Sequence, residues 1–185
     1  MRRVFIGIPA GAALVEAASA FRRSHAGFGV RWISTGNLHV TLVPPWETGD
    51  TGPLCRTLEA VAAGTPPIPV LFDRVSIGPD PRHPRLVWAT GAAPEALAEL
   101  AARLRRTFGN GGDTGRTFLL HLTLARLRRQ SGQTSIPPGF SEPAAWDGVL
   151  DEIALYESIL NPGGTEYRTL CRYPLPGIVP ERPVS

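Results

Sequence analysis

The sequence predicts an α+β protein whose two halves repeat one strand–helix–strand pattern. Short apolar runs with strand character alternate with amphipathic helices, several strands follow one another without a helix between them, and each half holds one strand of the form His-x-Thr. The 185 residues, 43% of them hydrophobic, are enough for a single domain with its own core. No apolar run approaches ~18 residues, so we expect no membrane contact.

In the first half, apolar periodicity predicts the elements in order. A short buried strand ends at Pro9, and a helix follows with Leu14, Ala18 and Phe21 at helical spacing. A later strand should stop at the Pro44-Pro45 pair, because proline donates no backbone hydrogen bond. The expected strands cover residues 3–8, 30–33 and 37–43, and the expected helices cover residues 10–23 and 54–63.

In the second half, a segment dense in Gly, Pro and Asp predicts a hairpin loop at 78–84. The helix expected at 94–108 has Pro94 near its start and Gly109 after its end. Strands are expected at 68–77, 86–89, 117–125, 149–158 and 167–173, with loops at 109–115 and over most of 128–148. We therefore expect one domain over 1–173 and a C-terminal tail over 174–185.

The two His-x-Thr strands carry the strongest functional signal. They read Leu38-His39-Val40-Thr41-Leu42 and Leu120-His121-Leu122-Thr123-Leu124. Side chains alternate along a strand, so His and Thr share one face while the apolar residues share the other. Two complete copies of this frame would arise by chance about twice in ten thousand such sequences.

Paired imidazoles suit the opening of a cyclic phosphodiester. One group must accept a proton from the attacking water while another donates one to the leaving sugar oxygen. Imidazole can do either near neutral pH, and threonine hydroxyls can bind the non-bridging oxygens where charge develops. The sequence thus predicts His39 and His121 as catalytic residues, with Thr41 and Thr123 as phosphate ligands.

Arg126 is a further candidate for phosphate binding, since all 19 basic residues are arginine and guanidinium groups bind phosphate well. It lies five residues after His121, so a regular strand would place it on the opposite face. It reaches the phosphate only if the strand ends or twists after Ala125.

The remaining histidines and the cysteines predict no metal site and no cofactor. His25 and His83 lack the Thr and the apolar frame and are expected in loops. Cys55 and Cys171 lie far apart without metal-type spacing, so we expect neither zinc nor a disulfide framework. A reducing cytoplasmic location is the corresponding expectation.

These motifs resemble the 2H phosphoesterase superfamily, and within it the RNA 2′,3′-cyclic phosphodiesterase branch, also called 2′-5′ RNA ligase. The likeness extends beyond the His-x-Thr strands to about residue 173. The similar segments are Arg3 to Pro9, Arg31-Trp32-Ile33, Asn37 to Leu42, Pro84 to Trp88, His121 to Arg126, and Leu155 to Ser158 with Gly164 and Tyr167.

The resemblance implies a bilobal fold of two pseudo-symmetric lobes, each with an antiparallel sheet and flanking helices, around a central cleft. It implies metal-independent hydrolysis of RNA 2′,3′-cyclic phosphate ends to 2′-phosphomonoesters, with reverse 2′-5′ ligation as a side activity. It assigns His39 as general acid to O3′ and His121 as base for water, with Thr41, Thr123 and Arg126 on the phosphate. We expect a monomer.

Alternatives remain at the level of substrate. A member of the same superfamily could act on a small cyclic nucleotide, an ADP-ribose cyclic phosphate or 2′-5′ oligoadenylate, and a non-catalytic nucleotide- or RNA-binding module could keep the same scaffold. Pro44-Pro45-Trp46 replaces the more usual exit from the first motif. Trp46 could stack a base, although packing in the core or at its rim is the simpler interpretation.

Overall fold

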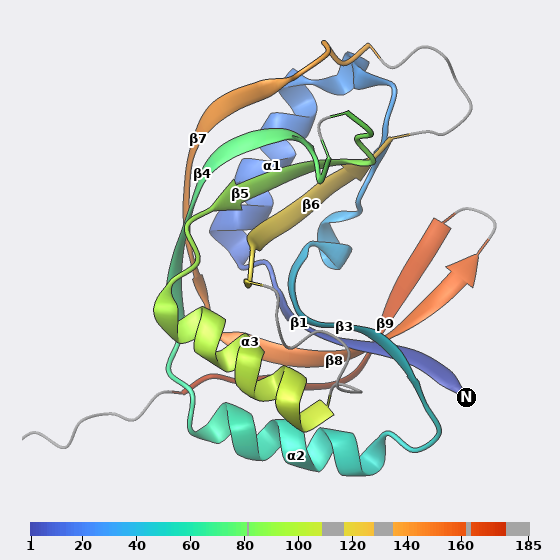
Figure 1. Cartoon of the computed structure of the whole chain (residues 1–185), viewed down its shortest axis with the longest axis vertical. Helices are drawn as coiled ribbons and strands as arrows, with labels where there is room; N and C mark the ends of the chain where they lie inside the picture. Colours follow the sequence, from blue (N-terminus) through green and yellow to red (C-terminus); the bar gives the residue numbers. More distant parts are fainter. Residues whose placement is uncertain (81, 109–116, 128–134, 162–163, 177–185) are drawn as a thin grey trace, which may run out of the picture.

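Two antiparallel sheets contain the nine strands of the described chain (Figure 1). The computed structural model describes residues 1–80, 82–108, 117–127, 135–161 and 164–176. The first sheet has the strand order β3-β1-β8-β9, and these strands are β1 (Arg2–Pro9), β3 (His39–Thr48), β8 (Glu152–Asn161) and β9 (Gly164–Pro174). The second has the order β2-β6-β5-β4-β7, and these are β2 (Arg31–Trp32), β4 (Ile68–Gly78), β5 (Leu86–Gly91), β6 (Leu120–Arg126) and β7 (Ser141–Leu150).

Three helices pack against these sheets. Helix α1 (Ala12–Ser24) contacts β7 of the second sheet, α2 (Gly52–Ala63) contacts β8 and β9 of the first, and α3 (Glu95–Phe108) contacts β3. Two short 3-10 turns, η1 (Ala26–Phe28) and η2 (Thr35–Asn37), flank β2. The predicted α+β class and the three predicted helices are confirmed.

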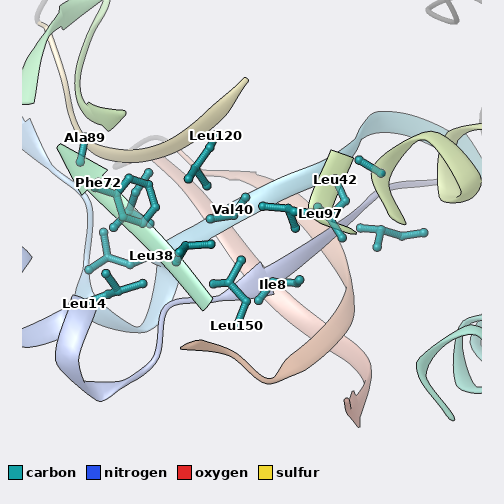
Figure 2. Packing of buried hydrophobic residues seen from close by; sticks show 14 of the residues in the cluster. Ile8, Leu14, Leu38, Val40, Leu42, Phe72, Ala89, Leu97, Leu120 and Leu150 are labelled. Carbon is teal, nitrogen blue, oxygen red and sulfur yellow. The ribbon is translucent and has the colours of Figure 1, made fainter. Parts of the chain in front are cut away.

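A large apolar core joins the two sheets (Figure 2), and a small second cluster contains Phe5, Ala154 and Tyr156. Val40 and Leu42 from β3 are fully buried, as are Leu120 and Leu122 from β6. The apolar faces of both His-x-Thr strands therefore bury as alternation predicts, which leaves the opposite faces for the polar side chains. No helix of the described chain is long and apolar enough to cross a membrane.

Strand β3 runs through the Pro44-Pro45 pair, so the predicted stop at residue 43 is wrong. The strand lies at the edge of its sheet, where a proline need not donate to a second neighbour. The register is also shifted between Val4 and Ile6 of β1, so Pro44 and Pro45 fall within an irregular stretch of the ladder.

Strand β7 was missed: residues 141–148 were expected in a loop, and the predicted strand 149–158 spans the junction of β7 and β8. Its exposure alternates along almost its whole length, but Pro143, Ala144 and Gly148 weaken the strand signal. As an edge strand of the second sheet, β7 tolerates them. The predicted loop at 109–115 and residues 128–134 lie outside the described residues.

Cys55 of α2 and Cys171 of β9 form a disulfide, with Cα atoms 6.1 Å apart. The expectation that these cysteines stay unpaired is wrong, because a sequence separation of 116 conceals the packing of α2 on β9. The two cysteines therefore give no support to the expected reducing location.

The chain remains packed slightly beyond the expected domain end. Strand β9 includes Pro174, and Leu175 is buried, with its N–H donating to the carbonyl of Asp151 at 2.7 Å. Residues 177–185 lie outside the described chain.

Candidate active site

The two His-x-Thr strands present their polar residues to one shared pocket. His39, Thr41, His121 and Thr123 are half-buried, whereas the residues between them are buried. The pocket has a volume of about 390 Å³ and is open to solvent. It is lined by Arg3, Phe5, Ile33, Asn37, His39, Thr41, Pro45, Leu86, His121, Thr123, Arg126, Ser158, Leu160, Thr165 and Tyr167. The structure thus brings together all five side chains that the sequence singled out.

Each His-x-Thr strand contains a β-bulge one residue after its threonine. In β3, Thr41 pairs with Gly7 of β1 but Val43 pairs with Ile6, so Leu42 is the extra residue. In β6, Thr123 pairs with Trp88 of β5 but Ala125 pairs with Val87, so Leu124 is the extra residue. The two halves therefore share a local irregularity as well as a motif.

The bulge in β6 explains how Arg126 reaches the pocket. Leu124 and the next residue, Ala125, are both buried, so the alternation of faces breaks there. Arg126 therefore returns to the face that carries His121 and Thr123. The sequence required a departure from regular strand geometry for Arg126 to reach the site, and this bulge provides it. The equivalent residue of β3, five after His39, is Pro44, so this position carries a cation in β6 only.

Both imidazoles are held in the same way. The Nδ1 of His39 lies 2.7 Å from the carbonyl oxygen of Asn37, and the Nδ1 of His121 lies 3.0 Å from that of Leu119. A carbonyl can only accept, so Nδ1 carries the proton in each ring. The Nε2 atom of each ring is then left to accept or donate a proton in the pocket.

His39 sits in an aromatic surround. Its ring centroid is 4.9 Å from that of Phe5 and 5.2 Å from that of Tyr167, the latter ring standing perpendicular to it. Burial lowers the pKa of His39, and the positive charges of His121 and Arg126 lower it further, against the opposing hydrogen bond to Asn37. These electrostatic effects agree with the three groups lining one pocket.

His121 has different neighbours. Its ring lies 5.3 Å from Trp88, whose Nε1 donates to the Ser76 hydroxyl at 3.2 Å. Trp88 pairs with Thr123, as Gly7 pairs with Thr41 in the other half. At matched positions of the neighbouring strands, His121 thus has an indole beside it and His39 has a glycine.

The two threonine hydroxyls are free to bind a ligand. Within the described chain, neither the Thr41 nor the Thr123 hydroxyl has a hydrogen-bond partner, and Arg126 has no carboxylate within ion-pairing distance. Two hydroxyls and one guanidinium around two imidazoles suit an anionic tetrahedral group. The described residues contain no cluster of His, Cys, Asp or Glu that could hold a metal ion.

Arg105 of α3 contributes to the site indirectly and was missed from the sequence. Its Nε donates to the carbonyl of Leu42 at 3.0 Å, which is the carbonyl of the bulge residue of β3. Its guanidinium also lies 5.6 Å from the ring centroid of Phe118, just before β6. One side chain thus contacts the bulge of β3 and a residue just before β6. No sequence signal separates it from the other arginines of its helix.

The other aromatic and histidine candidates lie outside the pocket. Trp46 packs against the core with its ring 6.4 Å from Phe108, as the simpler interpretation predicted. His83 is exposed in the turn after β4, where it pairs with Asp80. His25 caps the end of α1, stacked on Phe21.

The sequence and the fold are similar to those of several known proteins. The model of the 2′-5′ RNA ligase superfamily matches residues 11–161. An RNA 2′,3′-cyclic phosphodiesterase from Archaeoglobus fulgidus is 27% identical over 172 residues, which cover 91% of this chain and 97% of that protein. Among solved structures, a protein of Thermus thermophilus has a TM-score of 0.78 at 22% identity, with 95% of this chain and 98% of the other covered. The LigT protein of E. coli has a TM-score of 0.72 in its apo form and 0.69 in complex with 3′-AMP, at 28% identity and with the same coverage.

Proposed function

The chain belongs to the 2′-5′ RNA ligase superfamily of phosphoesterases, and from this premise we propose that it hydrolyses RNA 2′,3′-cyclic phosphate ends to 2′-phosphomonoesters. The observation that carries the proposal is the convergence of two imidazoles, two free hydroxyls and one guanidinium on a single pocket. A relative of nearly equal length that is named for this activity supports the choice of substrate.

The reaction needs one proton donor and one acceptor. A water molecule attacks phosphorus while its proton passes to Nε2 of His121, and the P–O3′ bond breaks as Nε2 of His39 protonates O3′. The products are a 2′-phosphomonoester and a free 3′-hydroxyl. The Thr41 and Thr123 hydroxyls and the Arg126 guanidinium bind the non-bridging oxygens, where negative charge grows.

The environment of His39 suits the role of acid. Burial lowers its pKa, which makes its imidazolium the stronger proton donor once it is formed. The negative charge of a bound phosphate favours that protonated form. Substrate binding thus brings the proton to the group that later releases it.

The same groups allow ligation when a hydroxyl replaces water as the nucleophile. A 5′-hydroxyl in place of water attacks the cyclic phosphate, O3′ leaves with a proton, and a 2′-5′ phosphodiester forms. We therefore propose 2′-5′ ligation as a side activity of the same groups.

The deciding experiment uses a short RNA with a 2′,3′-cyclic phosphate end and identifies the product isomer by ³¹P NMR. We expect a 2′-phosphate, at a rate that EDTA does not change. A 3′-phosphate, or chelator-sensitive turnover, would overturn the proposal, and tight binding without turnover would favour a binding module. ADP-ribose cyclic phosphate and 2′-5′ oligoadenylate serve as competing substrates.

Substitution of each histidine tests the assignment of roles. We expect His39→Ala and His121→Ala to abolish turnover, while the exposed His83→Ala, as matched control, changes nothing. A substrate whose 3′ leaving atom is sulfur needs little protonation of the leaving group. It should restore activity to His39→Ala and leave His121→Ala inactive; the opposite pattern would exchange the two roles.

A further inference from the structure

One wall of the pocket is not used by the proposed chemistry. It is the pocket-facing side of the β8–β9 hairpin, where Ser158 pairs with Tyr167 and Leu160 pairs with Thr165. Residues two apart on a strand share a face, so these four side chains form one patch, called here the hairpin patch.

The hairpin patch has the chemistry of a nucleoside site. Leu160 is 76% exposed, although it lines the pocket, and an apolar side chain in this position gains from being covered by an apolar surface. The ring of Tyr167 makes edge-to-face contacts with the rings of Phe5 and His39, at centroid distances of 4.9 and 5.2 Å, and these contacts fix its orientation. An aromatic ring beside an exposed leucine favours stacking of a base.

The two small polar members of the patch add hydrogen-bonding capacity. In the described chain, the hydroxyls of Ser158 and Thr165 have no protein partner. Each can donate to or accept from the edge of a base or a ribose hydroxyl. The patch therefore combines an apolar surface with polar groups, as ligand sites commonly do.

Arg3 supplies a second cation at the same end of the pocket. It lies on the pocket-facing side of β1 with Phe5, and it forms no ion pair with any described carboxylate, even though Glu47 is its partner across the ladder. Its neighbour Arg2 pairs instead with Glu157. Arg3 stands four residues along β1 from Gly7, the partner of Thr41, which is about 13 Å at about 3.3 Å per residue. A cation at that position suits a second phosphate rather than the reacting one.

We propose that the hairpin patch binds the 3′-terminal nucleoside of the substrate and that Arg3 binds the phosphate on the 5′ side of that nucleoside. The inference rests on the proposed function, with the cyclic phosphate between the two histidines. The pocket then recognises one whole terminal nucleotide within an RNA strand. A nucleoside 2′,3′-cyclic phosphate lacking the 5′ phosphate fills only part of it.

The test for Arg3 compares two substrates that differ in one group. They are uridine 2′,3′-cyclic phosphate and the same molecule with a 5′-methylphosphate, which mimics the continuing strand. We expect wild type to prefer the second in kcat/KM and Arg3→Ala to lose that preference, about 10- to 100-fold, with unchanged turnover of the first. Arg2→Ala, which changes the adjacent guanidinium, should keep the preference.

The test for the hairpin patch adds a third substrate, methyl riboside 2′,3′-cyclic phosphate, which has no base. Leu160→Ser should lower kcat/KM for uridine 2′,3′-cyclic phosphate at least about fivefold and leave the base-free substrate unchanged. Tyr167→Ala, whose lost ring also contacts His39, should lower kcat/KM for the uridine substrate by a larger factor than for the base-free one. Tyr167→Phe should retain base binding. Leu71→Ser changes a leucine that is 53% exposed outside the pocket, and should have no effect.

The outcomes separate the two proposals. If wild type hydrolyses these substrates but Arg3→Ala slows them equally or not at all, the second-phosphate site is refuted while the activity stands. If Leu160→Ser and Tyr167→Ala lower kcat/KM for the base-free substrate as much as for uridine 2′,3′-cyclic phosphate, the nucleoside site is refuted, because such losses would show only damage near His39. If wild type turns over none of the three substrates nor a cyclic-phosphate RNA, the proposed function and this inference both fail.

Discussion

Gly7 of β1 should be intolerant of any side chain because His39 packs directly over it. A Cβ at this position would lie 2.9 Å from the carbonyl oxygen of Val40 and 3.2 Å from Cδ2 of His39. The first contact is with backbone in the paired strand, which cannot turn away as a flexible side chain can. Gly7→Ala must therefore move β3 or the imidazole, at the point where the bulge begins.

The expected cost follows from these contacts. Overpacking by one methyl group in a tight core typically costs about 1–3 kcal/mol. We expect the free energy of unfolding of Gly7→Ala, measured in urea, to fall by that amount. If half of the strain, about 0.5–1.5 kcal/mol, appears as displacement of His39, kcat falls about two- to tenfold, since ~1.4 kcal/mol corresponds to a factor of ten.

Gly36→Ala is the matched control. Gly36 lies three residues before His39 in η2, and a Cβ there would meet nothing within 4 Å. Its variant should keep wild-type turnover of a cyclic-phosphate RNA. If Gly7→Ala turns over as fast as Gly36→Ala, then His39 is not held against β1 during the reaction, and the reasoning about the site geometry is refuted.

Three further predictions follow from the same structure. Burial holds the pKa of His39 below its usual 6.5. The neutral imidazole therefore contributes stability above about pH 6.5, and this contribution is lost as pH falls through the lowered pKa. His39→Gln should show a smaller loss of unfolding free energy than wild type between about pH 7.5 and 5. Reduction of the Cys55–Cys171 disulfide, or Cys55→Ser, should lower the unfolding free energy by about 2–5 kcal/mol; unfolding with and without reductant checks this, and no difference would mean that the bond does not form. Arg105→Ala should lose about 1.5–3 kcal/mol of stability with the hydrogen bond to the bulge carbonyl, and kcat should fall with it, whereas Arg106→Ala on the exposed side of α3 should match wild type in both measurements.

The pocket-facing sides of β3 and β6 could be predicted from the sequence because they depend on local alternation alone. In both His-x-Thr strands, a polar residue follows an apolar one with period two, and any strand with that pattern separates the two sets. The burial of Val40 and Leu122, with His39 and His121 opposite, follows directly. What the pattern does not contain is the distance between the two strands, which depends on the packing of two sheets.

The position of Arg126 shows where the local rule ends. Strict alternation places it on the wrong face, and the bulge at Leu124 reverses that. A signal was present, because two apolar residues, Leu124 and Ala125, interrupt the alternation, as Leu42 and Val43 do in the other half. Two adjacent buried residues in an otherwise alternating strand are what a bulge requires.

The disulfide and strand β7 were missed for a different reason. Contact between Cys55 and Cys171 exists only because α2 packs on the sheet that β9 completes, and no residue near either cysteine encodes that packing. Strand β7 carries Pro143 and Gly148, which local propensity reads as loop. Pairing with β4 overrides this propensity, and the composition of a segment does not specify which strand it pairs with.

The shared bulges and the unequal neighbours together explain how a nearly symmetric scaffold supports a reaction with direction. The two strands place imidazole and hydroxyl in equivalent positions, so either histidine could in principle give or take the proton. At matched positions the halves then diverge: Gly7 corresponds to Trp88, and Pro44 corresponds to Arg126. The indole lies beside His121, the buried, aromatic surround encloses His39, and Arg126 lines the pocket that both histidines share. We therefore propose that a cyclic phosphate binds with its charge toward Arg126 and meets two unequal histidines, and that this inequality decides which sugar oxygen leaves.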